Sequence, residues 1–202
     1  MPNYYDSIYK ENTNFCNQKP NELLAKFLKK LPKGKKVLDL GCGQGRDSFY
    51  LAQKNLHVTA VDNSKVAIVQ IKEAIKEKNA KNIWPVCKDI AKFKIKPGIF
   101  GLINCQNALQ FLPKKSALKT IENIKKNISP GGIIILTSFI AHTQPLDKNK
   151  SRFKPGEMKK LFSDSDFKIY YYFEGILNDK GHLGNPKPHK HGIVNIVAKK
   201  VF

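Results

Sequence analysis

Three glycines at alternate positions, Gly41, Gly43 and Gly45, follow an apolar run and precede a helical pattern. Glycines in such a turn let the backbone bend sharply and let a ligand reach the unpaired N–H groups at a helix amino terminus. Asp39 stands two residues before the first glycine, where a carboxylate repels a pyrophosphate and attracts the ammonium group of an amino-acid-like ligand. A dinucleotide-binding turn places its third glycine one residue later, which disfavours a nicotinamide cofactor. The turn residues expected to bind a cofactor are Asp39, Gly41, Cys42, Gly43, Gly45 and Arg46.

Two further acids follow later apolar runs and extend this candidate site. Asp62 ends the second run, about 20 residues after the glycine turn, where a carboxylate can accept hydrogen bonds from both hydroxyls of a ribose. Asn63 comes next, and Asp89 and Ile90 follow the third run, where they can contact an adenine edge and pack on its ring. The alternative is a tight turn whose acid only caps a helix, but acids after three successive runs favour a ligand site.

Histidines gather near the end of the chain, where His182, His189 and His191 accompany Lys187. These side chains can attract a small anion or move a proton near neutral pH, so the three histidines are the candidate catalytic residues. In the alternative interpretation, His189 and His191 merely flank the start of a strand. A zinc site made by the three histidines would lack the spacing of known finger or catalytic sites, so no metal is expected.

Alternating strands and helices are expected to position these residues. Short apolar runs predict strands at 37–40, 58–61, 83–86, 100–105, 133–139, 168–177 and 192–201. Helical spacing predicts helices at 20–31 and 116–128, one around Phe49, one capped by Ser64, and a short one with Pro155 in its first turn. Together these units imply a doubly wound α/β fold, with a mostly parallel seven-stranded sheet, helices on both faces and the last strand antiparallel.

The expected topology brings the candidate residues to one edge of the sheet. Open α/β sheets bind ligands at the carboxyl ends of their parallel strands, and the loop 178–190 between the last two strands should project from that edge. The chain of 202 residues is expected to form a single domain, with an N-terminal lid and helix at 1–32 and a catalytic α/β core at 33–202. The candidate lid residues are Tyr4, Tyr5, Phe15, Lys19 and Pro20.

The formal net charge of +20 suggests a nucleic acid or an anionic surface as partner. Its composition argues against that partner, because Arg46 and Arg152 are the only arginines among 36 basic residues, which leaves 36 − 2 = 34 lysines. Arginine suits bidentate recognition of phosphate or guanine, whereas dispersed lysine is typical of a solvated surface. A nucleic-acid partner is therefore the less favoured alternative.

Hydropathy and cysteine usage indicate a cytoplasmic protein with no membrane partner. The longest strongly apolar run, 131–141, is shorter than the roughly 20 residues that a membrane-spanning helix needs, and the amino terminus lacks a secretory pattern. Cys16, Cys42, Cys87 and Cys105 form no Cys-x-x-Cys pair, so free thiols are expected, the last three in buried or cofactor-lining segments. The sequence says nothing about the oligomeric state.

Several of these motifs resemble a known enzyme class. The segment 37–47 resembles motif I of the class I S-adenosylmethionine-dependent methyltransferases, 61–64 resembles their acidic second motif, and 129–132 resembles the turn before their fifth strand. Within that class, the segments 45–48, 152–157 and 189–192 are similar to the TehB-like tellurite-resistance branch. The resemblance implies a Rossmann-like fold and S-adenosylmethionine as cofactor, with Gln106 and Asn107 near its methionine part.

The resemblance also implies methyl transfer to a small molecule, such as a thiol or a chalcogen oxyanion like tellurite or selenite. A soft nucleophile of this kind needs little or no general base, so the protein mainly has to align it and exclude water. One alternative is a nucleic-acid or protein methyltransferase that uses the lysine-rich surface. Another is a non-catalytic sensor that binds the cofactor. Segment 104–110 lacks the Asp/Asn-Pro-Pro-aromatic motif of enzymes that methylate base amines.

Overall fold

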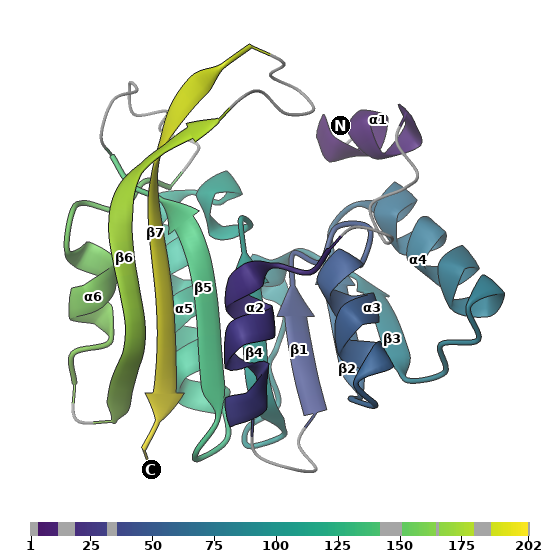
Figure 1. Cartoon of the computed structure of the whole chain (residues 1–202), viewed down its shortest axis with the longest axis horizontal. Coiled ribbons are helices and arrows are strands. Elements are labelled where there is room, and N and C mark those ends of the chain that lie inside the picture. Colours follow the sequence, from purple (N-terminus) through teal and green to yellow (C-terminus); the bar gives the residue numbers. More distant parts are fainter. Residues whose placement is uncertain are drawn as a thin grey trace.

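The computed structural model describes residues 4–11, 19–31, 36–141, 151–164, 166–179 and 187–201. Its centre is a seven-stranded sheet with the order β3-β2-β1-β4-β5-β7-β6 (Figure 1). The strands are β1 (Lys36–Leu40), β2 (Val58–Asp62), β3 (Ile83–Cys87), β4 (Phe100–Gln106), β5 (Ile133–Phe139), β6 (Phe167–Asp179) and β7 (His189–Lys200). β7 pairs antiparallel with β5 and β6, and the other pairs are parallel. This confirms the predicted sheet, including its antiparallel last strand.

Helices cover both faces of the sheet (Figure 1). The α-helices are α1 (Tyr4–Glu11), α2 (Glu22–Phe27), α3 (Arg46–Gln53), α4 (Lys65–Glu77), α5 (Lys114–Asn127) and α6 (Glu157–Leu161). Short 3₁₀ helices are η2 (Leu28–Lys30), η3 (Ile90–Lys92) and η4 (Leu109–Phe111). Apolar side chains of α2, α3 and α4 pack on one face, and those of α5 and α6 pack on the other. The sheet has a layer of helices on each face because its strands carry apolar side chains on both sides.

The β5 strand illustrates why the chain adopts this arrangement. Ile133, Ile134, Ile135 and Leu136 are completely buried, with odd positions facing α2 and even positions facing α5. β-branched side chains favour an extended backbone, and burial on both faces requires helices above and below. The prediction of an inner strand here is confirmed, since β5 lies between β4 and β7.

A few boundaries differ from the predicted ones for local reasons. Pro155 precedes α6 instead of lying in its first turn, because Gly156 adopts a left-handed conformation and acts as the N-cap. α5 begins at Lys114, two residues earlier than expected. Cys87 is exposed because it ends β3, the outermost strand of the sheet, whereas Cys105 is buried as expected.

The chain order reverses at β1, which has β2 on one side and β4 on the other. Loops that leave neighbouring parallel strands in opposite directions open a crevice at their carboxyl ends. α1 lies beyond this same edge, and the β6–β7 hairpin extends past it (Figure 1). No helix in the described ranges has both the length and the apolarity needed to cross a lipid bilayer.

Candidate functional site

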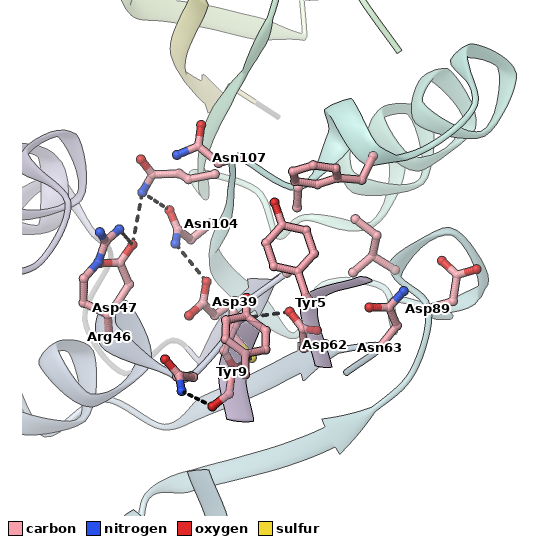
Figure 2. A pocket seen from close by; sticks show the side chains of 18 of the residues that line it. Tyr5, Tyr9, Asp39, Arg46, Asp47, Asp62, Asn63, Asp89, Asn104 and Asn107 are labelled. Atoms are coloured by element: carbon pink, nitrogen blue, oxygen red, sulfur yellow. Dashed lines mark hydrogen bonds and ion pairs between the residues drawn. The ribbon is translucent and has the colours of Figure 1, made fainter. Parts of the chain in front are cut away.

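A cavity of about 780 Å³ opens at the carboxyl ends of β1 to β4 (Figure 2). Most of the residues expected to bind a cofactor line it, namely Asp39, Gly41, Cys42, Gly43, Arg46, Asp62, Asn63, Asp89, Ile90, Gln106 and Asn107. Gly45 does not line the cavity; it is the N-cap of α3, with a φ of 87°. The structure therefore brings together side chains that come from four separate strand ends.

Hydrogen bonds to β2 shape the glycine turn. The backbone N–H groups of Gly41 and Cys42 both donate to the carbonyl oxygen of Val61, at 2.8 and 3.1 Å. Gly41 has a φ of 72°, and a Cβ atom there would lie 2.3 Å from the Cβ of Ala108. Only glycine fits this close approach, which keeps the turn tight beneath the cavity.

Asp39 is almost completely buried at the floor of the cavity, with 3% of its surface exposed. Its carboxylate accepts hydrogen bonds from the Ser48 hydroxyl at 2.6 Å and from the Asn104 amide at 2.9 Å. Burial and the nearby Asp47 carboxylate raise the pKa of Asp39 to about 7, against the lowering effect of these two hydrogen bonds. A buried carboxylate of this kind binds a cationic group strongly, because water competes poorly there.

Asp62 occupies the end of β2 in a similar way. Its Oδ2 accepts a hydrogen bond from the backbone N–H of Gly43 at 2.9 Å, and its Oδ1 accepts one from Ser64 at 2.8 Å. Burial raises the pKa of Asp62, and the backbone hydrogen bonds oppose that shift. Each carboxylate oxygen has a second lone pair, so Asp62 retains the capacity to accept two hydroxyl donors.

Arg46 and Asp47 form an ion pair at the start of α3 (Figure 2). The Nε of Arg46 lies 3.0 Å from Oδ1 of Asp47, and its Nη2 lies 3.3 Å from Oδ2. The backbone N–H of Asn21 also donates to Asp47, at 2.9 Å. This two-point contact fixes the guanidinium plane beside the cavity and leaves other N–H donors of Arg46 for an anionic group.

α1 closes one side of the cavity with Tyr5, Ile8 and Tyr9. The Tyr5 ring meets the Phe111 ring edge to face, with 5.0 Å between centroids. The Tyr9 carbonyl accepts a hydrogen bond from the Gln70 amide of α4 at 2.7 Å, which ties the helix to the core. Tyr5 was expected in a lid, whereas Ile8 and Tyr9 had no motif that indicated a role.

Asp89 lies at the third strand end, beside Ile90. Its Oδ1 accepts a hydrogen bond from the backbone N–H of Ala91 at 2.9 Å, so it caps the short η3 helix. Ile90 is buried and presents its side chain to the cavity. The remaining lining residues, which sequence reasoning did not assign a role in the site, are Gln44, Asp47, Asn104, Ala108, Phe111 and Leu112.

The late histidines that the structure describes do not line this cavity. His182 falls outside the described residues, and neither His189 nor His191 is among the lining residues. The Nε2 atoms of His189 and His191 are 2.6 Å apart, and the His191 ring stacks on Phe139 with 4.6 Å between centroids. Nδ1 of His189 lies 2.8 Å from the Lys187 carbonyl, an acceptor only, so this nitrogen carries the hydrogen and Nε2 faces His191. The described parts of the chain hold no cluster of three metal-binding side chains.

Comparisons with known proteins agree with this architecture. A family model described as "Methyltransferase domain" matches residues 31–175. The probable S-adenosyl-L-methionine-dependent methyltransferase TehB of Haemophilus influenzae is 31% identical over 153 residues, which cover 74% of this chain and 52% of the relative. The chain thus spans about half the length of the curated relatives it matches.

Solved structures show the same fold. The crystal structure of Haemophilus influenzae TehB has a TM-score of 0.78 and 24% sequence identity, covering 98% of this chain and 66% of that one. Magnesium protoporphyrin IX methyltransferase from Synechocystis, solved with bound S-adenosylmethionine, has a TM-score of 0.64 and 20% identity, covering 99% and 85% of the two chains. These two similarities show that the chain has the same fold as the two solved structures.

Proposed function

Because this chain belongs to the methyltransferase domain family, we propose that it transfers a methyl group from S-adenosylmethionine to a small-molecule acceptor. The observation that carries the proposal is the pairing of two buried acids, Asp39 and Asp62, on either side of a glycine turn at the strand ends. An acid for an ammonium group and an acid for a ribose are what this amino-acid-bearing nucleoside requires.

The residues present fit this cofactor. The buried Asp39 carboxylate suits the α-ammonium group, and Asp62 retains lone pairs for both ribose hydroxyls. Arg46 has N–H donors beyond its contact with Asp47 for the carboxylate of the amino-acid part. A Cβ atom at Gly43 would lie 2.9 Å from the Tyr9 hydroxyl, so the bare glycine keeps this part of the cavity open.

The other lining residues complete the proposed cofactor site. Asn63, Asp89 and Ile90 border the adenine, while Gln106 and Asn107 border the methionine part. Gly41, Cys42 and Gly43 bring the backbone close to the ligand, and Gly45, which does not line the cavity, turns the chain into α3 behind them. The bound cofactor supplies an electrophilic methyl group on a positively charged sulfur. The task of the chain is to align the acceptor with that carbon and to exclude water, and α1 covers the cavity for this purpose.

The proposed acceptor is a small, soft nucleophile, either a thiol or a chalcogen oxyanion such as tellurite or selenite. The likeness to a relative named TehB supports this choice. We assign the late histidines His182, His189 and His191 the role of attracting the acceptor or taking up its proton, since imidazole titrates near neutral pH.

The test is calorimetric titration with S-adenosylmethionine followed by a screen for release of S-adenosylhomocysteine. The acceptors are thiols, selenite, tellurite, small amines and RNA. Cofactor binding with product from a small acceptor supports the proposal. Product from RNA alone would replace it with a nucleic-acid methyltransferase, and binding without any product would leave a cofactor sensor. Heat from NADH but none from S-adenosylmethionine would remove the proposal altogether.

A further inference from the structure

A level of polar side chains crosses one face of the sheet where the cavity begins. Alternate residues of a strand share a face. On the face covered by α2, Val37 of β1 lies beside Leu102 of β4 in an apolar row. Two residues nearer the cavity edge, Asp39 lies beside Asn104, and one further step along, Gln106 of β4 lies beside Thr137 of β5, which lies beside Asn195 of β7. These polar groups hydrogen-bond to one another, and Asp39, Asn104 and Gln106 line the cavity, so this level borders the site.

Hydrogen bonds along this level fix the orientation of the Gln106 carboxamide. Asn104 donates its amide hydrogen to Asp39, so its carbonyl oxygen points away and accepts from the Nε2 of Gln106 at 2.7 Å. The same nitrogen lies 3.5 Å from Oδ2 of Asp47. Both partners are acceptors that line the cavity, so they occupy the two hydrogens of the Gln106 amide.

The carbonyl end of Gln106 is consequently the end available to a ligand. Thr137 lies nearest, with its hydroxyl 3.4 Å from the Oε1 of Gln106 and 2.8 Å from the Oδ1 of Asn195. A hydroxyl has one hydrogen, and it serves the closer acceptor, Asn195. Gln106 lines the cavity, so its carbonyl oxygen can accept a hydrogen bond there. A ligand with a hydrogen-bond donor would suit this position.

The charge of the cavity disfavours an anionic acceptor. Its described lining includes four carboxylates, those of Asp39, Asp47, Asp62 and Asp89, and a single cation, Arg46, which is already paired with Asp47. S-adenosylmethionine brings one net positive charge, which does not balance this surplus. An anion entering beside these carboxylates therefore meets repulsion that a neutral molecule does not.

The cavity also offers apolar contact next to the end of β4. Tyr5 and Ile8 of α1 face the lining residues Phe111 and Leu112, and the Tyr5 and Phe111 rings touch edge to face. Figure 2 shows Tyr5 reaching from α1 across the cavity towards Asn107. These side chains suit an apolar body and provide no partner for a formal charge.

We infer that the acceptor is an uncharged thiol on an apolar body, and that Gln106 determines this specificity by accepting a hydrogen bond from the S–H group. The inference rests on the proposed function and narrows it from two acceptor classes to one. In the transfer, the acceptor sulfur forms a bond to the methyl carbon. The bond from that carbon to the cofactor sulfur breaks, its electron pair stays on that sulfur, and the acceptor proton leaves to water, which can pass it to the histidines assigned above.

Two thiols that differ only in charge test the acceptor class. Benzyl mercaptan and 4-(mercaptomethyl)benzoate share their body and their thiol chemistry, and tellurite and selenite complete the panel. We expect kcat/KM at least about tenfold higher for benzyl mercaptan than for the benzoate, from the repulsion near the carboxylates. Equal or better use of the benzoate, or product from the oxyanions only, overturns the inference and leaves the proposed methyl transfer standing. Cofactor binding with no product from any acceptor removes both.

A matched pair of glutamine variants tests the role of Gln106. Gln106→Met keeps the size of the side chain and removes the amide, that is, the carbonyl acceptor and the N–H groups that contact Asn104 and Asp47. We expect it to raise the KM for benzyl mercaptan about three- to tenfold, the effect of one hydrogen bond. Gln110→Met is the control, since Gln110 is also a buried glutamine but does not line the cavity. A rise in KM that exceeds any change in cofactor Kd supports the inference, with thermal unfolding as the check on folding. Equal changes in both variants, or a change in cofactor Kd alone, overturn the role of Gln106.

Discussion

Lowering the pH from 7 to 6 should weaken binding of S-adenosylmethionine about fivefold, because Asp39 takes up a proton over this range. Burial and the Asp47 carboxylate raise the pKa of Asp39 to about 7. Only the ionised carboxylate attracts the ammonium group of the cofactor, so the apparent Kd scales with 1 + 10^(pKa − pH). That factor is about 2 at pH 7 and about 11 at pH 6. The amino group of the ligand stays protonated below pH 7, so it adds little to the change.

Calorimetry across this pH range measures the effect, with one ligand control and one pair of variants. 5′-Methylthioadenosine has the nucleoside but no ammonium group, so its affinity should stay nearly constant. Asp39→Asn removes the titrating group and should give weaker binding with little pH dependence, whereas Asp89→Asn removes an acid at the cavity rim and should keep the wild-type slope. An affinity of the wild type for S-adenosylmethionine that does not change between pH 6 and 7 would contradict this role of Asp39. The same holds if Asp39→Asn keeps the wild-type pH dependence.

The same proton affects folding with the opposite sign. The ligand-free folded chain holds a proton on Asp39 up to about pH 7, whereas the unfolded chain releases it near the ordinary value of 3.8. This group therefore favours the folded state at low pH, and its contribution is lost as the pH rises from about 4 to 7. Thermal unfolding of wild type and Asp39→Asn without ligand should diverge over this window. Cofactor affinity and ligand-free stability thus move in opposite directions, a combination that a general pH effect would not produce.

Other substitutions test the remaining parts of the site. Asp62→Ala should weaken cofactor binding by about 1 to 3 kcal/mol, because the ribose hydroxyls lose their acceptor. A cofactor Kd equal to that of the wild type, measured by calorimetry, would contradict that role. Gly41→Ala places a Cβ atom 2.3 Å from the Cβ of Ala108, so it should lower the free energy of unfolding by more than about 2 kcal/mol in denaturant titrations. Gly98→Ala is its control: Gly98 also has a positive φ but open space around it, so it should lose only about 1 to 2 kcal/mol, and an equal loss in both would show that the close approach is unimportant.

The sheet and the cofactor half of the cavity follow from local sequence patterns. Asp39 and Asp62 end short apolar runs, and parallel strands bring such ends together whatever the details of packing. The glycine turn is equally local, since each of its residues lies within seven positions of Asp39. Patterns of this kind depend on backbone geometry, which a short segment largely determines by itself.

The rest of the site depends on contacts between distant segments. Tyr9 meets Gln70 across 61 positions. Tyr5, Ile8 and Tyr9 have the spacing of one helix face, but that spacing alone does not say that the face lies over the cavity. The orientation of Gln106 depends on its contacts with Asn104 and Asp47. Asp47 reaches Gln106 only after β4 has paired with β1, because the two residues lie far apart in the sequence. The positions of His189 and His191 depend on the register of the β6–β7 hairpin, which no turn motif specifies.

The attachment of α1 has a consequence for kinetics. Two side-chain hydrogen bonds join it to the N-cap and the body of α4, one from Ser64 to Asp6 and one from Gln70 to the Tyr9 carbonyl. α1 lines one side of the cavity, so we expect its detachment from α4 to widen the path by which a ligand leaves. These eight residues supply few polar groups to the cavity, whereas the acids on β1 and β2 lie at its floor. A change in the contacts between α1 and α4 should therefore alter how fast a nucleoside exchanges more than how tightly it is held.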